Sequence, residues 1–165
     1  MTMIALGIDP GSHMTGYGVV EKRGSLLVPI DNGCISARKQ STLAERLGQI
    51  HAGLMEMIEK FHPDVVAIEE VFFAKNVSSM VKLGESRGVA LLAATQHKIP
   101  VYEYSPREVK QAITGYGQAT KGQVQKMIVR LLKLPEIAQV DASDALAVAV
   151  CHLNSIKMIT ARGAG

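Results

Sequence analysis

The stretch DVVAIEEVFF, residues 64–73, indicates the architecture of the chain. Its run VVAI shows no apolar–polar alternation, which is typical of a strand buried on both faces in the middle of a parallel sheet. Pro63 stands just before the stretch and ends the helix that we expect upstream. Because parallel neighbours require crossover connections, this strand predicts an α/β fold with helices on both faces of a mixed sheet.

Four further strands are predicted around this one. MIALGID, residues 3–9, is an apolar strand that ends in the turn residues DPGS. The stretch 15–36 suggests two more strands with a turn at residues 22–24, and so a three-stranded antiparallel meander. IPVYEY, residues 99–104, is the fifth strand. Gly11, Gly16 and Gly18 form no phosphate cradle, because a strand follows them where a helix would be needed.

Capping patterns and apolar spacing predict five helices. Apolar residues spaced by three and four follow the first cap, whereas the last helix, residues 140–150, is almost entirely apolar. In the second helix, over 77–97, Gly84 and Gly88 stand four residues apart, so we expect its own sheet or a second copy to pack closely there. The predicted caps are Thr42 with Glu45, Ser105 with Glu108, and Thr120 for a helix running to Lys133.

Composition is that of one globular domain. The chain has 165 residues, of which 47% are hydrophobic and 20% charged. We expect a single domain over 1–158 and a short disordered tail over 159–165. No apolar run is long enough to span a membrane, so no membrane partner is expected. Cys34 and Cys151 form no CxxC or zinc spacing, which favours a reduced, cytoplasmic compartment.

Positive charge is concentrated in one segment. Residues 105–133 contain six Lys or Arg residues and one acid, a net charge of +5, although the whole chain carries only +3. Such a segment favours an anionic partner.

Four acids stand where a sheet collects ligands. Asp9 ends the first strand, and Glu69 ends the VVAI run, with Glu70 pointing to the opposite face. Asp141 and Asp144 open the last helix, three residues apart and so on one helix face. Because ligands of open α/β sheets bind at the carboxyl ends of the strands, we expect the carboxylates of Asp9, Glu69, Asp141 and Asp144 to converge.

Each acid also has a simpler interpretation. An acid in a turn or at a strand end is usually solvated, and Asp141 is suited to be the N-cap of its helix. Carboxylates that converge without cations, however, raise one another's pKa and destabilise the fold. Divalent metal relieves this repulsion, because Mg²⁺ prefers oxygen ligands. We therefore expect two Mg²⁺ ions about 4 Å apart, an arrangement suited to phosphodiester hydrolysis, with Mn²⁺ as the substitute.

Several stretches, taken in order, resemble one known family. They are LGIDPGSHMTGYGVV (6–20), AIEEVFFAKN (67–76), LGESRGVA (83–90), EYSPREVKQAITGYGQATKGQVQ (103–125), LLKLP (131–135) and DASDALAVAV (141–150). From about Met3 to His152 the chain resembles the RuvC-type Holliday-junction resolvases of bacteria.

This resemblance implies a ribonuclease-H-like fold with a five-stranded mixed sheet. It implies that Asp9, Glu69, Asp141 and Asp144 are the metal-binding acids, with Glu69 favoured over Glu70 because the family motif is A-I-E. The implied activity is a Mg²⁺-dependent endonuclease for DNA recombination and repair. It cuts Holliday junctions in paired, symmetric incisions that leave 5′-phosphate and 3′-hydroxyl ends.

The resemblance also implies DNA contacts and partners. Phe72 matches an aromatic residue that stacks on bases in the opened junction, although the adjacent Phe73 leaves open which ring does so. Lys121 is expected near the scissile phosphate, where it assists catalysis, and the remaining expected strand contacts are Lys75, Arg87 and Lys110. The expected partners are a four-way DNA junction, a second copy of the chain in a homodimer, and a junction-migrating helicase complex.

Two other functions remain as alternatives. A non-catalytic junction-binding DNA module would keep the basic segment but lose the acids, and all four acids are present. An actin-like ATP-binding protein begins with a similar strand and turn but needs two such lobes, and this chain has the length of one.

Overall fold

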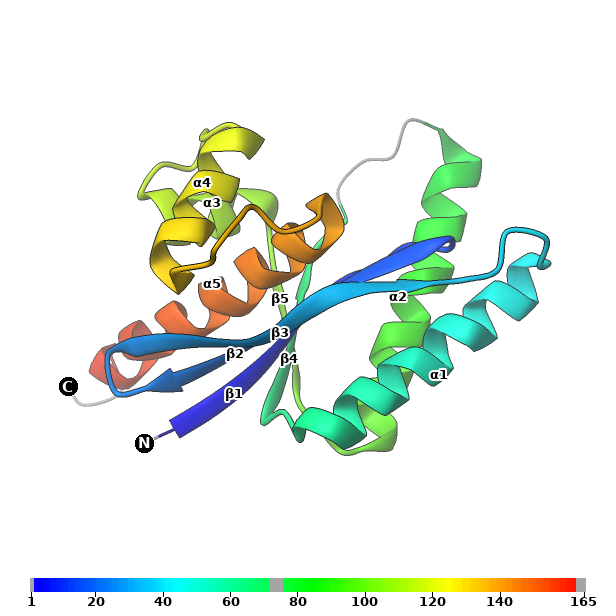
Figure 1. Ribbon diagram of the computed structural model, residues 1–165, viewed down its shortest axis with the longest axis horizontal. Coiled ribbons are helices and arrows are strands. Elements are labelled where there is room, and N and C mark those ends of the chain that lie inside the picture. Colours follow the sequence, from blue (N-terminus) through cyan, green and yellow to red (C-terminus); the bar gives the residue numbers. More distant parts are fainter. Residues whose placement is uncertain (1, 72–75, 163–165) are drawn as a thin grey trace.

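Strand β4 (Val65–Glu69) lies between two parallel neighbours, as its apolar run predicts (Figure 1). The computed structural model describes residues 2–71 and 76–162. Strand β1 (Thr2–Asp9) pairs with one side of β4, and β5 (Val101–Tyr104) pairs with the other. The strand order in the sheet is β3-β2-β1-β4-β5. The expected mixed, five-stranded α/β sheet is therefore confirmed.

The first three strands form the predicted antiparallel meander. Strand β2 (Met14–Arg23) pairs with β1 from Asp9↔Gly16 to Thr2↔Arg23, and β3 (Leu26–Ser36) pairs with β2. The turn expected at residues 22–24 lies at residues 24–25 instead. Strand β2 continues through Arg23, and the chain reverses at Gly24, whose φ of 61° suits glycine.

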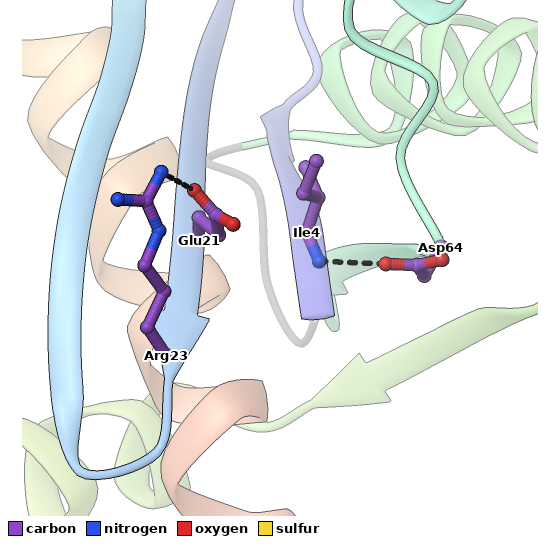
Figure 2. Close-up of polar contacts among 4 residues, drawn as sticks. All are labelled: Ile4, Glu21, Arg23 and Asp64. Carbon is purple, nitrogen blue, oxygen red and sulfur yellow. Dashed lines mark hydrogen bonds and ion pairs between the residues drawn. The ribbon is translucent and has the colours of Figure 1, made fainter. Parts of the chain in front are cut away.

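Polar contacts fix the start of the sheet (Figure 2). The backbone N–H of Ile4 donates a hydrogen bond of 2.7 Å to Asp64 Oδ2, which ties β1 to the residue before β4. Arg23 Nη2 lies 2.6 Å from Glu21 Oε2 on the same strand. These contacts lie at the opposite end of the sheet from Asp9 and Glu69.

All five predicted helices are present. They are α1 (Leu43–Phe61), α2 (Val77–Gln96), α3 (Pro106–Thr114), α4 (Lys121–Leu132) and α5 (Val140–Arg162). The capping boxes of Thr42 and Ser105 form as predicted, and Thr120 caps α4. Helix α5 continues to Arg162, into the segment expected as a tail, and the domain boundary at residue 158 stays a prediction.

Alternation along the strands separates two cores, one on each face of the sheet. Leu6 and Ile8 of β1 pack with buried residues of α1 and α2. Ala5 packs on the other face, together with Ala67 of β4 and the apolar side chains of α3, α4 and α5. Leu146 of α5 is fully buried, and its truncation to alanine is expected to cost about 2–5 kcal/mol. Helices thus cover both faces, as predicted.

Helix α2 has an exposed apolar surface in its first turns. Val77 is 78% exposed and Val81 is 53% exposed. A Cβ atom added at Gly84 or Gly88 would meet no atom of the described chain within 4 Å. The expectation that the chain's own sheet packs against these glycines is therefore wrong, and packing by a second copy remains.

None of the helices in the described chain combines the length and apolar character that crossing a membrane requires.

Candidate active site

Three glycines allow α5 to lie directly on the sheet. A Cβ atom at Gly7 of β1 would collide with the carbonyl oxygen of Ala145, and one at Gly16 of β2 would collide with that of Asp141. A Cβ atom at Gly18 would lie 2.7 Å from the backbone nitrogen of Leu146. Such contacts with backbone atoms exclude any side chain, so this glycine seam (Gly7, Gly16 and Gly18) sets the distance between α5 and the strands.

The seam brings the first turn of α5 to the end of β1. One carboxylate oxygen from each of Asp9, Asp141 and Asp144 lies within 4.8 Å of the other two. Asp9 lies on the α5 face of the sheet, because it follows Ala5 and Gly7 in the strand alternation. Residues that are distant in the sequence thus form one acidic cluster (Asp9, Asp141 and Asp144), as the sequence predicts.

The interpretation of Asp141 as an N-cap is wrong. Helix α5 begins one residue earlier, at Val140, so Asp141 lies within its first turn. The backbone N–H of Ser143 donates to the carbonyl oxygen of Gln139 at 2.7 Å. Backbone therefore satisfies the N–H of Ser143, and the Asp141 carboxylate lies beside those of Asp9 and Asp144.

Glu69 stands beside the acidic cluster. It shares the α5 face with Ala67 and lines a cleft of about 230 Å³ together with Lys110, Lys121 and Asp144. Burial raises the pKa of Glu69, the Asp144 charge raises it further, and the charges of Lys121 and Lys110 lower it in part. Glu69 also lines an adjoining cleft of about 370 Å³ with Asp9 and Glu70. The structure thus brings Glu69 to the site, although it is not one of the three acids in closest contact.

Burial and mutual repulsion together raise the pKa values of the acids in the site. Burial, with the charges of Asp144 and Asp141, raises the pKa of Asp9 from 3.8 to about 8. The pKa of Asp144 is also raised, chiefly by burial, although Lys121 opposes this shift. A cluster of carboxylate oxygens with raised pKa values fits a hard divalent cation, which supplies the positive charge that the site lacks.

Lys121 supplies one cation to the cluster. It is the first residue of α4, and its Nζ lies 3.0 Å from Asp144 Oδ2. Burial alone would lower the pKa of Lys121, but the hydrogen bond and charge of Asp144 outweigh burial and raise it. Lys121 is therefore held in the charged form at the mouth of the cleft.

The other residues predicted to contact DNA are placed differently. Lys110 of α3 lines the cleft of Glu69 and Asp144. Arg87 of α2 instead forms an ion pair with Glu103 of β5, with 2.6 Å between Nη2 and Oε1. Its Nε is buried without a hydrogen-bond partner in the described part of the chain. Its assignment as a strand contact stays a prediction. Phe72, Phe73 and Lys75 lie outside the described residues.

Sequence reasoning missed the glycine seam. In the sequence alone, Gly16 and Gly18 resemble only a phosphate cradle, and Gly7 lies within an ordinary apolar strand. Their alternation on one face of two adjacent strands is a signal of close helix packing, but it becomes readable only once the pairing of β1 with β2 is known.

Comparison with models of protein families shows to which family the chain belongs. The model of a family described as crossover junction endodeoxyribonuclease RuvC matches residues 5–152. The chain belongs to the RuvC family. The crossover junction endodeoxyribonuclease RuvC of Geobacter sp. strain M21 is 54% identical over 156 residues, covering 94% of this chain and 95% of the relative. The enzyme of the same name from Geotalea uraniireducens is 56% identical over 153 residues, covering 93% of this chain and 90% of the relative.

Solved structures agree with this membership of the RuvC family. Thermus thermophilus RuvC in complex with Holliday junction substrate has a TM-score of 0.90 and 37% identity, with 96% of this chain and 97% of that chain covered. The yeast mitochondrial Holliday junction resolvase Ydc2 has a TM-score of 0.71 at 13% identity, and so shares the fold. The ribonuclease-H-like fold expected from the resemblance is confirmed.

Proposed function

We propose that this protein is an endonuclease that resolves Holliday junctions by hydrolysing DNA phosphodiester bonds at the acidic cluster. The observation that carries the proposal is the convergence of Asp9, Asp141 and Asp144 at the end of β1, with Glu69 beside them, in a chain of the RuvC family. The T. thermophilus relative was solved with a Holliday junction bound. Nothing in the comparisons favours the non-catalytic junction-binding module.

Divalent metal fits the donor set of the site. All the convergent groups are carboxylates, whose oxygens suit Mg²⁺ or Mn²⁺, and the raised pKa of Asp9 indicates that positive charge is lacking. We assign Asp9, Asp141, Asp144 and Glu69 as the ligands and propose two Mg²⁺ ions. When bound, such ions would activate a water molecule for attack and stabilise the leaving oxygen.

The lysines act on the phosphate. Lys121 stands at the mouth of the cleft next to Asp144, where its charge would stabilise the negative charge that develops during hydrolysis. Lys110 lines the same cleft and would bind a neighbouring phosphate. Stacking of Phe72 on a base, and contacts of Lys75 and Arg87 with the DNA strands, remain proposals that rest on the family resemblance.

A homodimer would supply the two sites that paired, symmetric incisions require. We propose α2 as its interface, because Val77 and Val81 are exposed there and space is open over Gly84 and Gly88. A second α2 helix could approach these glycines closely. Incisions leaving 5′-phosphate and 3′-hydroxyl ends are proposed from the family resemblance, as is action with a junction-migrating helicase complex.

Two further assignments complete the proposal. The single nuclease domain is placed over 1–158, which includes the whole family match. A cytoplasmic location is supported by Cys34 and Cys151, which are free thiols as is usual in a reducing compartment.

The test is cleavage of a synthetic four-way junction with a mobile centre. We expect Mg²⁺-dependent conversion to nicked duplexes that ligase can seal, and no cleavage in EDTA. Linear duplex of the same sequence should stay intact, and Asp9→Asn should bind the junction without cutting it. Sealable products also test the proposed end chemistry. Junction binding without cleavage under Mg²⁺ or Mn²⁺ would instead establish the non-catalytic module.

A further inference from the structure

Two exposed cations stand on the α1 side of the active-site end of the sheet. Arg38 and Lys39 follow β3 in the loop that leads to α1, and both are exposed. We call these two residues, together with the turn at residues 11–13 that supports them, the basic ledge. Unlike the segment 105–133, the basic ledge is not evident as a long run of positive charge.

A backbone hydrogen bond places Arg38 and Lys39 beside the turn that follows β1, the strand that ends in Asp9. The backbone N–H of Ala37 donates to the carbonyl oxygen of His13 at 2.9 Å. His13 is four residues from Asp9, and four residues of extended chain span at most about 14 Å. The basic ledge therefore lies within a few nucleotides of any phosphate held at Asp9.

Side-chain hydrogen bonds fix the backbone of the basic ledge. Arg46 of α1 donates to the carbonyl oxygens of Ser12 at 3.2 Å and Ser41 at 2.8 Å, and so bridges the turn and the loop. Gln49 Oε1 accepts from the backbone N–H of Arg38 at 2.8 Å, and Gln49 Nε2 donates to Ser41 Oγ at 3.0 Å. Little ordering would therefore be needed when a ligand binds.

The charges of Arg38 and Lys39 are not neutralised by the protein. Across residues 2–71 and 76–162, no acid lies at ion-pair distance from either side chain, whereas Arg23, Lys60 and Arg87 each have an acidic partner. The nearby Glu45 accepts the backbone N–H of Thr42 in the helix cap. Two adjacent, unpaired cations on a rigid support favour an anionic ligand.

The basic ledge and the lysines of the cleft lie on opposite sides of the sheet. Lys110 and Lys121 belong to α3 and α4, which cover the α5 face, whereas the basic ledge continues into α1 on the other face (Figure 1). The acidic cluster lies between them at the end of β1. A DNA strand with one phosphate at Asp9 would meet cations on both sides of that phosphate.

We propose that the basic ledge binds backbone phosphates of the cleaved DNA strand, on the side of the scissile phosphate away from Lys110 and Lys121. The proposal rests on the proposed function for DNA as the ligand and adds a second binding surface to it. Contacts of this type position the strand and do not read its sequence. The basic ledge should therefore bind the phosphates of a linear duplex as well as those of a junction.

The test measures the salt dependence of DNA binding by the variant Arg38→Gln/Lys39→Gln. Affinities for a four-way junction and for a linear duplex are measured in EDTA between about 50 and 200 mM salt. We expect weaker binding of both DNAs and a slope of log K against log salt that is less steep by about 2, close to 1 for each lost phosphate contact. Both side chains are exposed, so an unchanged melting temperature should accompany the loss.

Lys60→Gln/Lys98→Gln is the control for the loss of charge, although Lys60, unlike Arg38 and Lys39, has an acidic partner in Asp31 at 3.9 Å. It removes the same charge from residues that precede β4 and β5, at the opposite end of the sheet. An unchanged slope for Arg38→Gln/Lys39→Gln, or an equal change in the control, would overturn the proposal. Junction cleavage by the wild-type protein is scored separately, and the linear duplex reports on the basic ledge even if no junction is cut. Failure of the basic ledge is thereby distinguished from failure of the proposed function.

Discussion

Ionisable side chains have polar partners at one end of the sheet, whereas at the other end they repel one another. At the end where β4 begins, Asp64 accepts a backbone hydrogen bond and Glu21 pairs with Arg23 (Figure 2). At the other end, Asp9 faces two further aspartates, and its pKa rises to about 8. Polar groups at the first end are satisfied by the protein itself. The carboxylates at the second end repel one another until a cation binds. Perturbed pKa values of this kind are common at functional sites.

Helix α5 contributes to both ends. Its first turn carries Asp141 and Asp144, whereas His152, in the middle of the helix, is buried and hydrogen-bonded to the Tyr104 hydroxyl at 2.7 Å. His152 also lines a cleft with Met3 and Asp64 at the other end of the sheet. Burial and the charge of Lys22 lower the pKa of His152 to about 4, so this histidine is neutral near pH 7. One helix therefore carries both a buried, hydrogen-bonded side chain and two carboxylates that repel Asp9.

The largest expected effect comes from Gly16→Ala, which would push α5 away from β2 at Asp141. We expect cleavage to fall about 100-fold, because a displacement near 1 Å disrupts a catalytic arrangement. Overpacking should also lower the free energy of unfolding by about 1–3 kcal/mol. Single-turnover cleavage and urea denaturation measure the two effects.

Gly48→Ala is the control for this prediction. Gly48 lies in α1 with open space around its Cα, so alanine should raise the free energy of unfolding by about 0.5–1 kcal/mol and leave cleavage unchanged. If Gly16→Ala cleaved the junction at the rate of the wild-type protein, the glycine seam would not be what positions the acids.

The next effect concerns pH and metal. In the metal-free protein the folded-state pKa of Asp9, about 8, exceeds the ordinary value of 3.8. The folded state therefore retains a proton that the unfolded state releases, so stability is fully present below pH 3.8 and is lost as pH rises through 8. We expect the melting temperature in EDTA to fall by at least about 2–4 °C from pH 6.5 to above 8, and Mg²⁺ to restore it.

Thermal denaturation of Asp9→Asn separates this effect from other titrations. The variant should melt higher than the wild type in EDTA above pH 8 and respond less to Mg²⁺. Titration of His152 has the opposite effect on stability. Its folded-state pKa near 4 lies below the ordinary value of 6.5, so the folded protein loses stability as the pH falls from 6.5 toward 4. An equal pH dependence of wild type and Asp9→Asn above pH 6.5 would contradict the repulsion described for the acidic cluster.

The smallest effect is expected at the satisfied end of the sheet. Arg23→Gln removes an exposed ion pair with Glu21, and water screens such pairs so that they contribute little to stability. We expect an unchanged midpoint of urea denaturation and unchanged junction cleavage. A large loss of stability or of junction cleavage would show that the Arg23–Glu21 end of the sheet is as sensitive to substitution as the end with the acidic cluster.

Local signals in the sequence determined most of the fold. The capping boxes of Thr42 and Ser105 involve residues three positions apart, and the apolar run of β4 needs no partner to be recognised. The positions of Asp9 and Glu69 at strand ends are also local signals, because the neighbouring residues show where each strand ends. The proximity of Asp9 and Glu69 followed from the general rule that parallel strands expose their carboxyl ends together, whereas the position of Asp141 and Asp144 depends on how α5 packs on the sheet.

Only the tertiary structure decided which distant residues meet. The glycine seam depends on the register Gly7↔Gly18, and the pairing of Arg87 with Glu103 depends on how α2 crosses to β5. Arg38 and Lys39 come close to Asp9 only because β3 returns beside the turn after β1. These contacts join residues that are far apart in the chain, and their geometry is set by strand register and helix packing, which no local pattern encodes.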